Sequence, residues 1–179
     1  MKIFLFFPVF CFYGCTISLD GPEQPVKYVD LEKFMGKWYV IAFTPTFVDE
    51  GAENGIETYR LGEDGNIEIE YTFSIDGEFE SHLQTGIVQP DPSNAKWRLK
   101  YNWLLSFDYY LIVEIDPEYE YTVIVFPDRS YVWVMSREKK MDEKLLVEIL
   151  TRLKERGYDM ETVSYTHLTL PTKNEGLVS

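Results

Sequence analysis

Cysteine and histidine, the residues that most often serve as nucleophile, general base or transition-metal ligand, are scarce in this sequence. Its 179 residues include two cysteines and two histidines: Cys11, Cys15, His82 and His167. Both cysteines lie in the first fifteen residues, so the body of the chain has no disulfide, cysteine nucleophile or cysteine metal ligand. A Ser-His-Asp set would have to use His82, which stands among polar neighbours typical of a surface position. We predict no catalytic residue, no metal site and no cofactor.

The balance of charge excludes one class of partner. The chain has 30 Asp and Glu against 17 Lys and Arg, a formal net charge of -13. Nucleic-acid binding needs a basic surface that releases counterions from the phosphates, so we predict no nucleic-acid partner. An anionic membrane would repel this surface too. Any membrane attachment must therefore use something other than a polybasic patch.

The N-terminal residues have the pattern of a secretory signal. Lys2 precedes an apolar run, Ile3–Tyr13, which is shorter than the roughly 20 residues of a membrane-spanning helix. An uncleaved short anchor is the alternative. The sequence Phe12-Tyr13-Gly14-Cys15 resembles the lipobox of bacterial lipoproteins. This resemblance implies that Cys15 is lipidated and becomes the mature N-terminus.

Lipidation would set both the location and the domain plan of the chain. Thr16, and not Asp, follows the cysteine, which in bacterial lipoproteins suggests delivery to the outer membrane. Acyl chains would anchor a protein whose acidic surface cannot attach by itself. We therefore predict an outer-membrane lipoprotein of the bacterial cell envelope that faces the periplasm. Residues 1–14 are then the signal peptide, and residues 15–29, which contain Gly21, Pro22 and Pro25, form a tether.

Strand-like runs separated by turn signals make up most of the remaining chain. The run Ile67–Phe73 alternates strictly, with Ile67, Ile69, Tyr71 and Phe73 on one face and Glu68, Glu70 and Thr72 on the other. The Gly and Asp residues before it signal a hairpin. The eight predicted strands are residues 38–43, 56–61, 67–73, 79–89, 97–103, 109–115, 119–126 and 131–135.

The apolar period changes only after the eighth strand. Residues 141–159 place one apolar stripe on a helix: Leu145, Leu146, Ile149, Leu150 and Leu153. Eight hairpin-connected strands and one late helix predict an all-β fold. We expect an eight-stranded antiparallel up-and-down β-barrel with a C-terminal α-helix, whose interior holds one small ligand. A two-sheet sandwich is the alternative.

Three motifs, in order along the chain, are similar to the characteristic regions of lipocalins. Gly36-Lys37-Trp38 opens the first strand, Asp116–Tyr121 precedes the seventh, and Arg137 ends the eighth. The similarity is greatest to bacterial lipocalins and apolipoprotein D and extends from about Val29 to Val163. It implies a lipocalin domain over residues 30–163.

This resemblance implies structural roles for Gly36, Trp38 and Arg137. In lipocalins the arginine that ends the eighth strand packs over the tryptophan of the first. Arg137 would therefore cover Trp38 by cation-π contact and backbone hydrogen bonds and close the barrel floor. The alternative is a half-buried strand that starts at the Pro127-Asp128 turn and ends in a solvated arginine.

The resemblance also implies which residues meet a ligand. The tryptophan at the position of Trp133 points into the cavity, and alternation puts Tyr131 and Met135 on the same face. Tyr59 corresponds to a ligand-contacting tyrosine of apolipoprotein D, and Tyr71 and Phe73 lie on an apolar strand face. Ordinary barrel-core packing is the alternative for each. The predicted ligand-binding residues are Tyr59, Tyr71, Trp133, Tyr131, Met135 and Phe73.

Two further segments carry expectations. Residues 44–54 are expected to form a lid over the barrel mouth, where their acidic residues could disfavour a fatty-acid carboxylate, although charged loops are usually only solvated. Residues 164–179 resemble translated sequencing-adapter read-through and are predicted to be a non-native tail. In lipocalins a short strand follows the helix, so the native last strand would then be missing.

The leading hypothesis is a membrane-anchored binding protein. It would hold an amphipathic lipid ligand, a fatty acid or lysophospholipid, in the barrel for lipid storage, transport or membrane maintenance. One alternative is a lipocalin-fold enzyme that acts on a lipid or isoprenoid. The other is a partner-binding protein of the envelope, and the sequence leaves a homodimer open.

Overall fold

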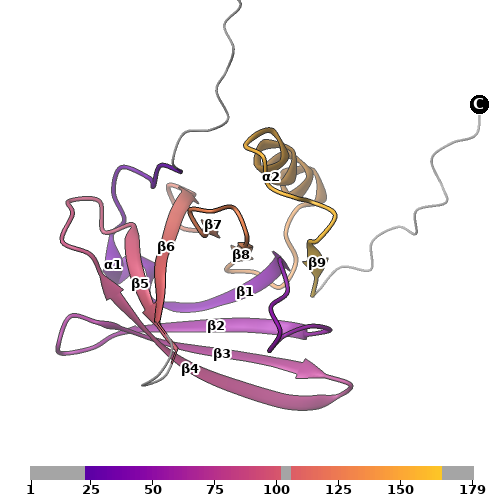
Figure 1. The fold of residues 1–179 in the computed structure, drawn as a ribbon, viewed down its shortest axis with the longest axis horizontal. Coiled ribbons are helices and arrows are strands. Elements are labelled where there is room, and N and C mark those ends of the chain that lie inside the picture. Colours follow the sequence, from indigo (N-terminus) through magenta and orange to yellow (C-terminus); the bar gives the residue numbers. More distant parts are fainter. Residues whose placement is uncertain (1–22, 102–105, 167–179) are drawn as a thin grey trace, which may run out of the picture.

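The described part of the chain folds into one closed antiparallel β-barrel. The computed structural model describes residues 23–101 and 106–166. Its sheet runs in the order β2-β3-β4-β5-β6-β7-β8-β1, and a further pairing between β1 and β2 closes it (Figure 1). The predicted eight-stranded up-and-down barrel with a late helix is confirmed, and the two-sheet sandwich is wrong.

Eight strands build the barrel, and a ninth strand and two helices flank it. The strands are β1 (Gly36–Phe43), β2 (Glu53–Leu61), β3 (Ile67–Ile75), β4 (Glu78–Val88), β5 (Lys96–Lys100), β6 (Ser106–Ile115), β7 (Tyr121–Val125), β8 (Val132–Ser136) and β9 (Ser164–Tyr165). The helices are α1 (Leu31–Phe34) and α2 (Glu143–Glu155).

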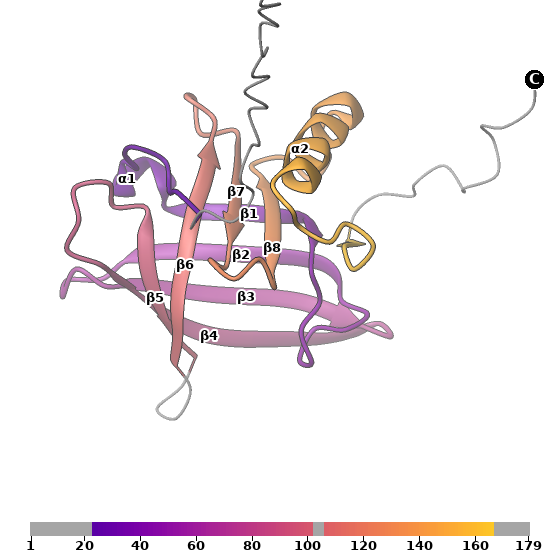
Figure 2. The same ribbon diagram turned by 45° about the horizontal axis from the view of Figure 1, so that its top comes forward.

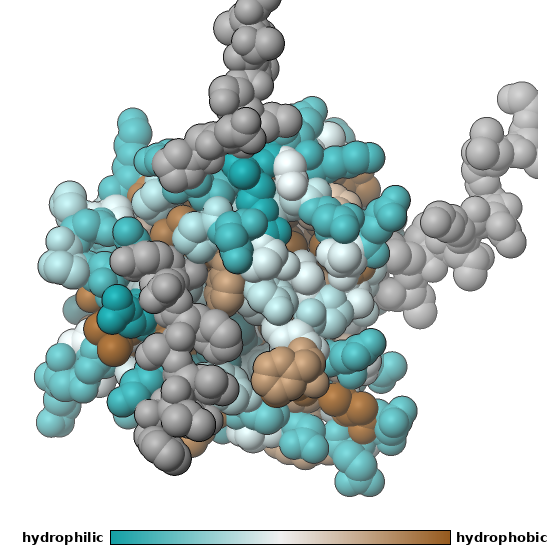
Figure 3. Space-filling view, viewed as in Figure 1, coloured by the Kyte–Doolittle hydropathy of each residue, from teal (hydrophilic) through white to brown (hydrophobic). Residues whose placement is uncertain are grey.

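Alternation of side chains determines which face of a strand is buried. In β3, the four apolar residues of the predicted face are buried and Glu68 is exposed. The turn before it uses Gly65, whose φ of 79° costs glycine little, and the Asn66 amide donates to the Asp64 carboxylate at 3.0 Å. The inner face of β3 is therefore apolar, while most of the face seen in Figure 3 is hydrophilic.

One end of the barrel is closed by α1 and Arg137. The guanidinium carbon of Arg137 lies 3.7 Å from the centroid of the buried Trp38 ring. Its nitrogens donate at 2.7–3.1 Å to four backbone carbonyl oxygens, those of Lys33, Phe34, Met35 and Lys37. Gly36 has a φ of 96°, and a Cβ there would lie 3.5 Å from Arg137 Nη1. The arginine thus ties α1 to β1 across the floor of the barrel.

Helix α2 packs against the outside of the barrel (Figure 2). Its N-cap, Asp142, accepts a hydrogen bond from the Leu145 amide at 2.9 Å. Leu146, Ile149 and Leu153 are buried in a second apolar cluster, which also contains outward-facing residues of β1, β6, β7 and β8. The predicted apolar stripe therefore faces the sheet. This outer layer leaves the barrel interior to other side chains.

The last residues predicted as tether are held on the barrel. The Val26 amide donates to the carbonyl of Ile112 at 2.9 Å, and the Val29 amide to that of Ser93 at 2.7 Å. Glu23 forms ion pairs with Arg129 and Arg156. These contacts hold residues 23–29 against the barrel, and a tether over residues 15–29 stays a prediction. Residues 1–22, which include the predicted signal sequence and Cys15, lie outside the described residues.

A short strand follows α2, at the start of the segment predicted to be a non-native tail. Ser164 and Tyr165 form β9, which pairs with Phe43 and Ala42 of β1. The Thr166 hydroxyl also donates to the Val40 carbonyl. The chain therefore supplies a strand in the place where a lipocalin was expected to have one. Residues 167–179, including His167, lie outside the described residues, and the non-native origin of the tail stays a prediction.

Candidate functional site

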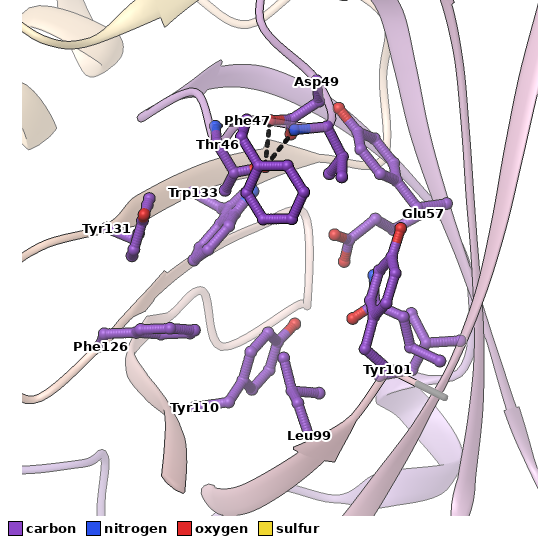
Figure 4. Close-up of a pocket in the computed structure, with 14 residues that line it drawn as sticks. Thr46, Phe47, Asp49, Glu57, Leu99, Tyr101, Tyr110, Phe126, Tyr131 and Trp133 are labelled. Carbon is purple, nitrogen blue, oxygen red and sulfur yellow. Dashed lines mark hydrogen bonds between the residues drawn. The ribbon is translucent and has the colours of Figure 1, made fainter. Parts of the chain in front are cut away.

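A cavity of about 110 Å³ lies in the half of the barrel opposite Arg137. Its walls come from β2 to β6, from β8 and from the loop between β1 and β2 (Figure 4). Beneath it, the Tyr59 ring packs against Phe34 and Trp97, at centroid distances of 5.1 and 5.9 Å, and separates the cavity from the floor. Half of the residues that line it are aromatic: Phe47, Tyr71, Tyr101, Tyr110, Phe126, Tyr131 and Trp133.

Three of the six predicted ligand-binding residues line this cavity. Tyr71 reaches it from β3, Trp133 from β8, and Tyr131 from the turn before β8. Trp133 and Tyr131 stack with ring centroids 6.0 Å apart, and Phe126 completes an apolar group on the same wall (Figure 4). Strand alternation had predicted that these side chains face the barrel interior. Their contact with a ligand stays a prediction.

The other three predicted residues are buried outside the cavity lining. Tyr59 belongs to the layer under the cavity and is 1% exposed. Met135 lies one alternation step further toward the floor than Trp133 and is fully buried in the core. Phe73 stacks on His82 with ring centroids 5.3 Å apart. Alternation gives the face of a strand but not the depth at which a side chain meets the cavity.

Two carboxylates line the cavity, Glu57 and Asp49, which are 6% and 2% exposed. Sequence reasoning missed Glu57, whereas Asp49 belongs to the acidic loop expected over the barrel mouth. Glu57 accepts a hydrogen bond from the Tyr59 hydroxyl, which in turn bonds the Tyr110 hydroxyl. Asp49, expected to be a solvated loop charge, accepts hydrogen bonds from the amide and hydroxyl of Thr46 at 2.6 and 2.7 Å. The available signal was that Glu57 shares its strand face with Tyr59.

Burial sets the charge state of this cluster. Removal from water raises the pKa of Glu57 from 4.5 to about 7; the Tyr59 hydrogen bond opposes the shift and the nearby Asp49 adds to it. Burial also raises the pKa of Asp49 and, with the neighbouring carboxylates, that of Tyr71. The cavity therefore holds an acid that titrates near neutral pH.

His82 also differs from its predicted place. It is half-buried on β4, and its Nδ1 lies 2.5 Å from the hydroxyl of Tyr101. Its ring stacks between Phe73 and Tyr101, because alternation turns it to the same face as Gln84. His82 was expected to be a surface residue, and its side chain is half-buried between two aromatic rings. Among the described residues, no group of His, Cys, Asp and Glu is arranged to hold a metal ion.

The family model of the lipocalin-like domain matches residues 29–167. The chain belongs to the lipocalins. Its barrel resembles the solved structure of insecticyanin from the tobacco hornworm Manduca sexta, with a TM-score of 0.64 at 17% identity over 82% of this chain and 84% of the other. That likeness supports the fold alone. Proteins of this family generally bind small hydrophobic ligands and are not enzymes.

Curated relatives of this lipocalin come from several kingdoms. The temperature-induced lipocalin-1 of Arabidopsis thaliana is 29% identical, covering 80% of this chain and 81% of its own. The outer membrane lipoprotein Blc of Vibrio cholerae is 26% identical over 84% of this chain and 93% of its own. Bovine apolipoprotein D is 24% identical over 81% and 80%. The predicted resemblance to bacterial lipocalins and apolipoprotein D is thus confirmed.

No helix in residues 23–101 and 106–166 is both long and apolar enough to span a bilayer.

Proposed function

We propose that this lipocalin binds an amphipathic hydrophobic ligand in the barrel cavity, for lipid storage, transport or membrane maintenance. The carrying observation is the aromatic cavity opposite the closed floor. Concave sites with mostly apolar walls and a few polar groups are typical of small-molecule binding. The cavity resembles in size an engineered void of about 150 Å³ that takes up benzene. It would therefore enclose one end of a fatty acid or lysophospholipid, and the rest would extend through the mouth.

Replacing Trp133 with alanine is expected to weaken this binding. The indole, which is half-buried, forms one wall of the cavity with Phe126 and Tyr131. Its loss removes apolar contact worth about 2 kcal/mol, roughly thirtyfold in affinity. Native mass spectrometry of the protein purified without detergent, followed by lipid extraction, would show a co-purified lipid in the wild type and little in the variant.

The matched control is Tyr28→Ala, which removes a 59% exposed aromatic ring outside the cavity. Equal lipid loss in both variants, or wild-type lipid content in Trp133→Ala, would contradict a ligand site in this cavity.

The same spectra report whether the protein is a homodimer. They also detect a hydrolysed lipid, and chromatography of the extract detects an isomerised one; either product is expected of the alternative enzyme function, for which Glu57 is the acid-base group best placed.

We further propose that acyl chains on Cys15 anchor the protein to the bacterial outer membrane, facing the periplasm. The support is the lipobox-like sequence before Cys15 and the relatives named outer membrane lipoprotein in Vibrio, Citrobacter and Escherichia. The Cys15→Ser variant is expected to leave the membrane fraction, because one hydroxyl cannot replace buried acyl chains. The mass of the membrane-extracted protein checks this. A Cys11→Ser variant is the control, and wild-type membrane recovery of Cys15→Ser would contradict the anchor.

A further inference from the structure

The cavity interior is acidic on one side. The Glu57 side chain points from β2 toward the centre of the cavity, and the hydroxyl of Tyr110 points toward the same region (Figure 4). The carboxylate of Asp49 is turned toward Thr46 at the edge of the cavity. Among the described residues that line the cavity, there is no lysine or arginine to balance these two carboxyl groups. A bound cation would balance the charge of these carboxyl groups when they are ionised.

A second group in the cavity lacks a partner. Tyr71 is 4% exposed and lines the cavity from β3. Within the described residues, its hydroxyl oxygen has no hydrogen-bonding partner. An unpaired buried hydroxyl is costly, and a bound ligand with hydrogen-bond donors would satisfy its acceptor capacity. Asp49 lies close enough to raise the pKa of this tyrosine, but no well-formed hydrogen bond joins the two groups, and the unpaired oxygen indicates a polar group on the ligand.

The aromatic walls suit a positive charge as well as an apolar chain. The π-faces of Tyr and Trp attract ammonium groups, more strongly when water is excluded. A carboxylate ligand would instead meet Glu57 and Asp49, and like charges at close range in a buried site repel strongly. Both the rings and the carboxyl groups therefore favour the same sign of charge on the ligand.

We propose that the cavity binds its amphiphile through a protonated amine, which pairs with Glu57 and donates to the Tyr71 hydroxyl. This inference rests on the proposed ligand-binding function and names the polar group of that ligand. The ammonium group enters the acidic end of the cavity, and the apolar chain leaves past Phe126, Tyr131 and Trp133 toward the mouth. Lipids that carry an ammonium group are favoured over simple fatty acids.

Three probes of equal chain length test the inference: octylamine, octanol and octanoate. Titration calorimetry with the wild-type protein at about pH 8, where Glu57 is ionised, should show octylamine binding at least about tenfold more tightly than octanol, because the bond to the carboxylate is charge-assisted. Octanoate should bind most weakly. The Glu57→Gln variant keeps the side-chain shape but not the charge, and it should bind octylamine no more tightly than octanol.

Proton release gives a readout that needs no variant. At about pH 6 Glu57 is largely protonated, and pairing with an ammonium group must expel that proton. The enthalpy of octylamine binding should therefore depend on the ionisation enthalpy of the buffer, while that of octanol should not. Titratable groups around Glu57 are Asp49 on the loop, Tyr59 on β2, Tyr71 on β3, Tyr110 on β6 and, through Tyr101, His82 on β4. The Glu57→Gln variant retains all of these groups, so any buffer dependence that remains in it measures the protons that they release.

The two proposals fail in different ways. If none of the three probes binds, the proposed ligand-binding function of the cavity is overturned and the amine inference with it. If octanol or octanoate binds as tightly as octylamine, or if Glu57→Gln keeps the amine preference, only the inference is overturned. Should the variant fold poorly, the buffer dependence in the wild type decides the question alone.

Discussion

Replacing Arg137 with alanine is expected to lower the free energy of unfolding by about 3 kcal/mol, and the melting temperature by roughly 10 °C. The guanidinium group stacks 3.7 Å from the Trp38 ring centroid and donates to four carbonyl oxygens at the end of α1 and the start of β1. Without it, the part-buried carbonyl of Met35 loses its Arg137 donor, that of Phe34 keeps only the Trp38 indole, and the floor of the barrel loses its cover. Urea unfolding at neutral pH measures the change.

Two further arginine variants show whether the effect comes from this geometry. Arg60→Ala removes an exposed pair with Glu70 on the outer face of the barrel, and should cost at most about 0.5 kcal/mol. Arg137→Lys keeps the charge, but a lysine has no planar guanidinium group that can donate to several carbonyls at once. Its free energy of unfolding should lie between those of the wild type and the alanine variant. If Arg137→Ala were no less stable than Arg60→Ala, the floor-closing role would be excluded.

Local patterns predicted the barrel because strand alternation and turn residues act over a few neighbouring positions. The same rules failed where distant contacts decide the conformation. Tyr119 was predicted to begin the seventh strand, yet it lies in the turn before β7 with a φ of 62°. Its hydroxyl accepts a hydrogen bond from the Asp30 amide at 2.7 Å. A contact across 89 positions leaves no trace in the residues beside Tyr119.

The cavity shows the same limit at the level of side chains. The resemblance to lipocalins placed six residues on interior strand faces, and three of them line the cavity: Trp133, Tyr131 and Tyr71. It could not distinguish these from Tyr59, Phe73 and Met135, which face the interior at other depths. Glu57 was passed over because acidic residues are rarely buried. Glu57 lies two positions from Tyr59 and so shares its inward strand face, which indicated burial. Only closure of the barrel, however, brings Asp49 and Tyr110 near Glu57.

The buried acid should also make the stability of the protein depend on pH in an unusual direction. Glu57 has a pKa of about 7 in the folded state, against 4.5 as its ordinary value, because burial disfavours its charge. Between these values the unfolded chain releases the proton while the folded protein keeps it. The unfolded state then binds fewer protons, so stability falls as the pH rises through this window. The loss attributable to Glu57 is about 3 kcal/mol by pH 8.

The Glu57→Gln variant isolates this contribution. Asp49, whose pKa is also raised by burial, contributes with the same sign but remains in both proteins. Urea unfolding from about pH 4.5 to 8 should show the free energy of unfolding of the variant rising by about 3 kcal/mol relative to the wild type. Most of this relative gain should be reached by about pH 7. Any constant offset between the curves reflects the new amide hydrogens. Parallel curves would mean that Glu57 is ionised in the folded protein at low pH, because its contacts with Tyr59 or with water then offset its burial.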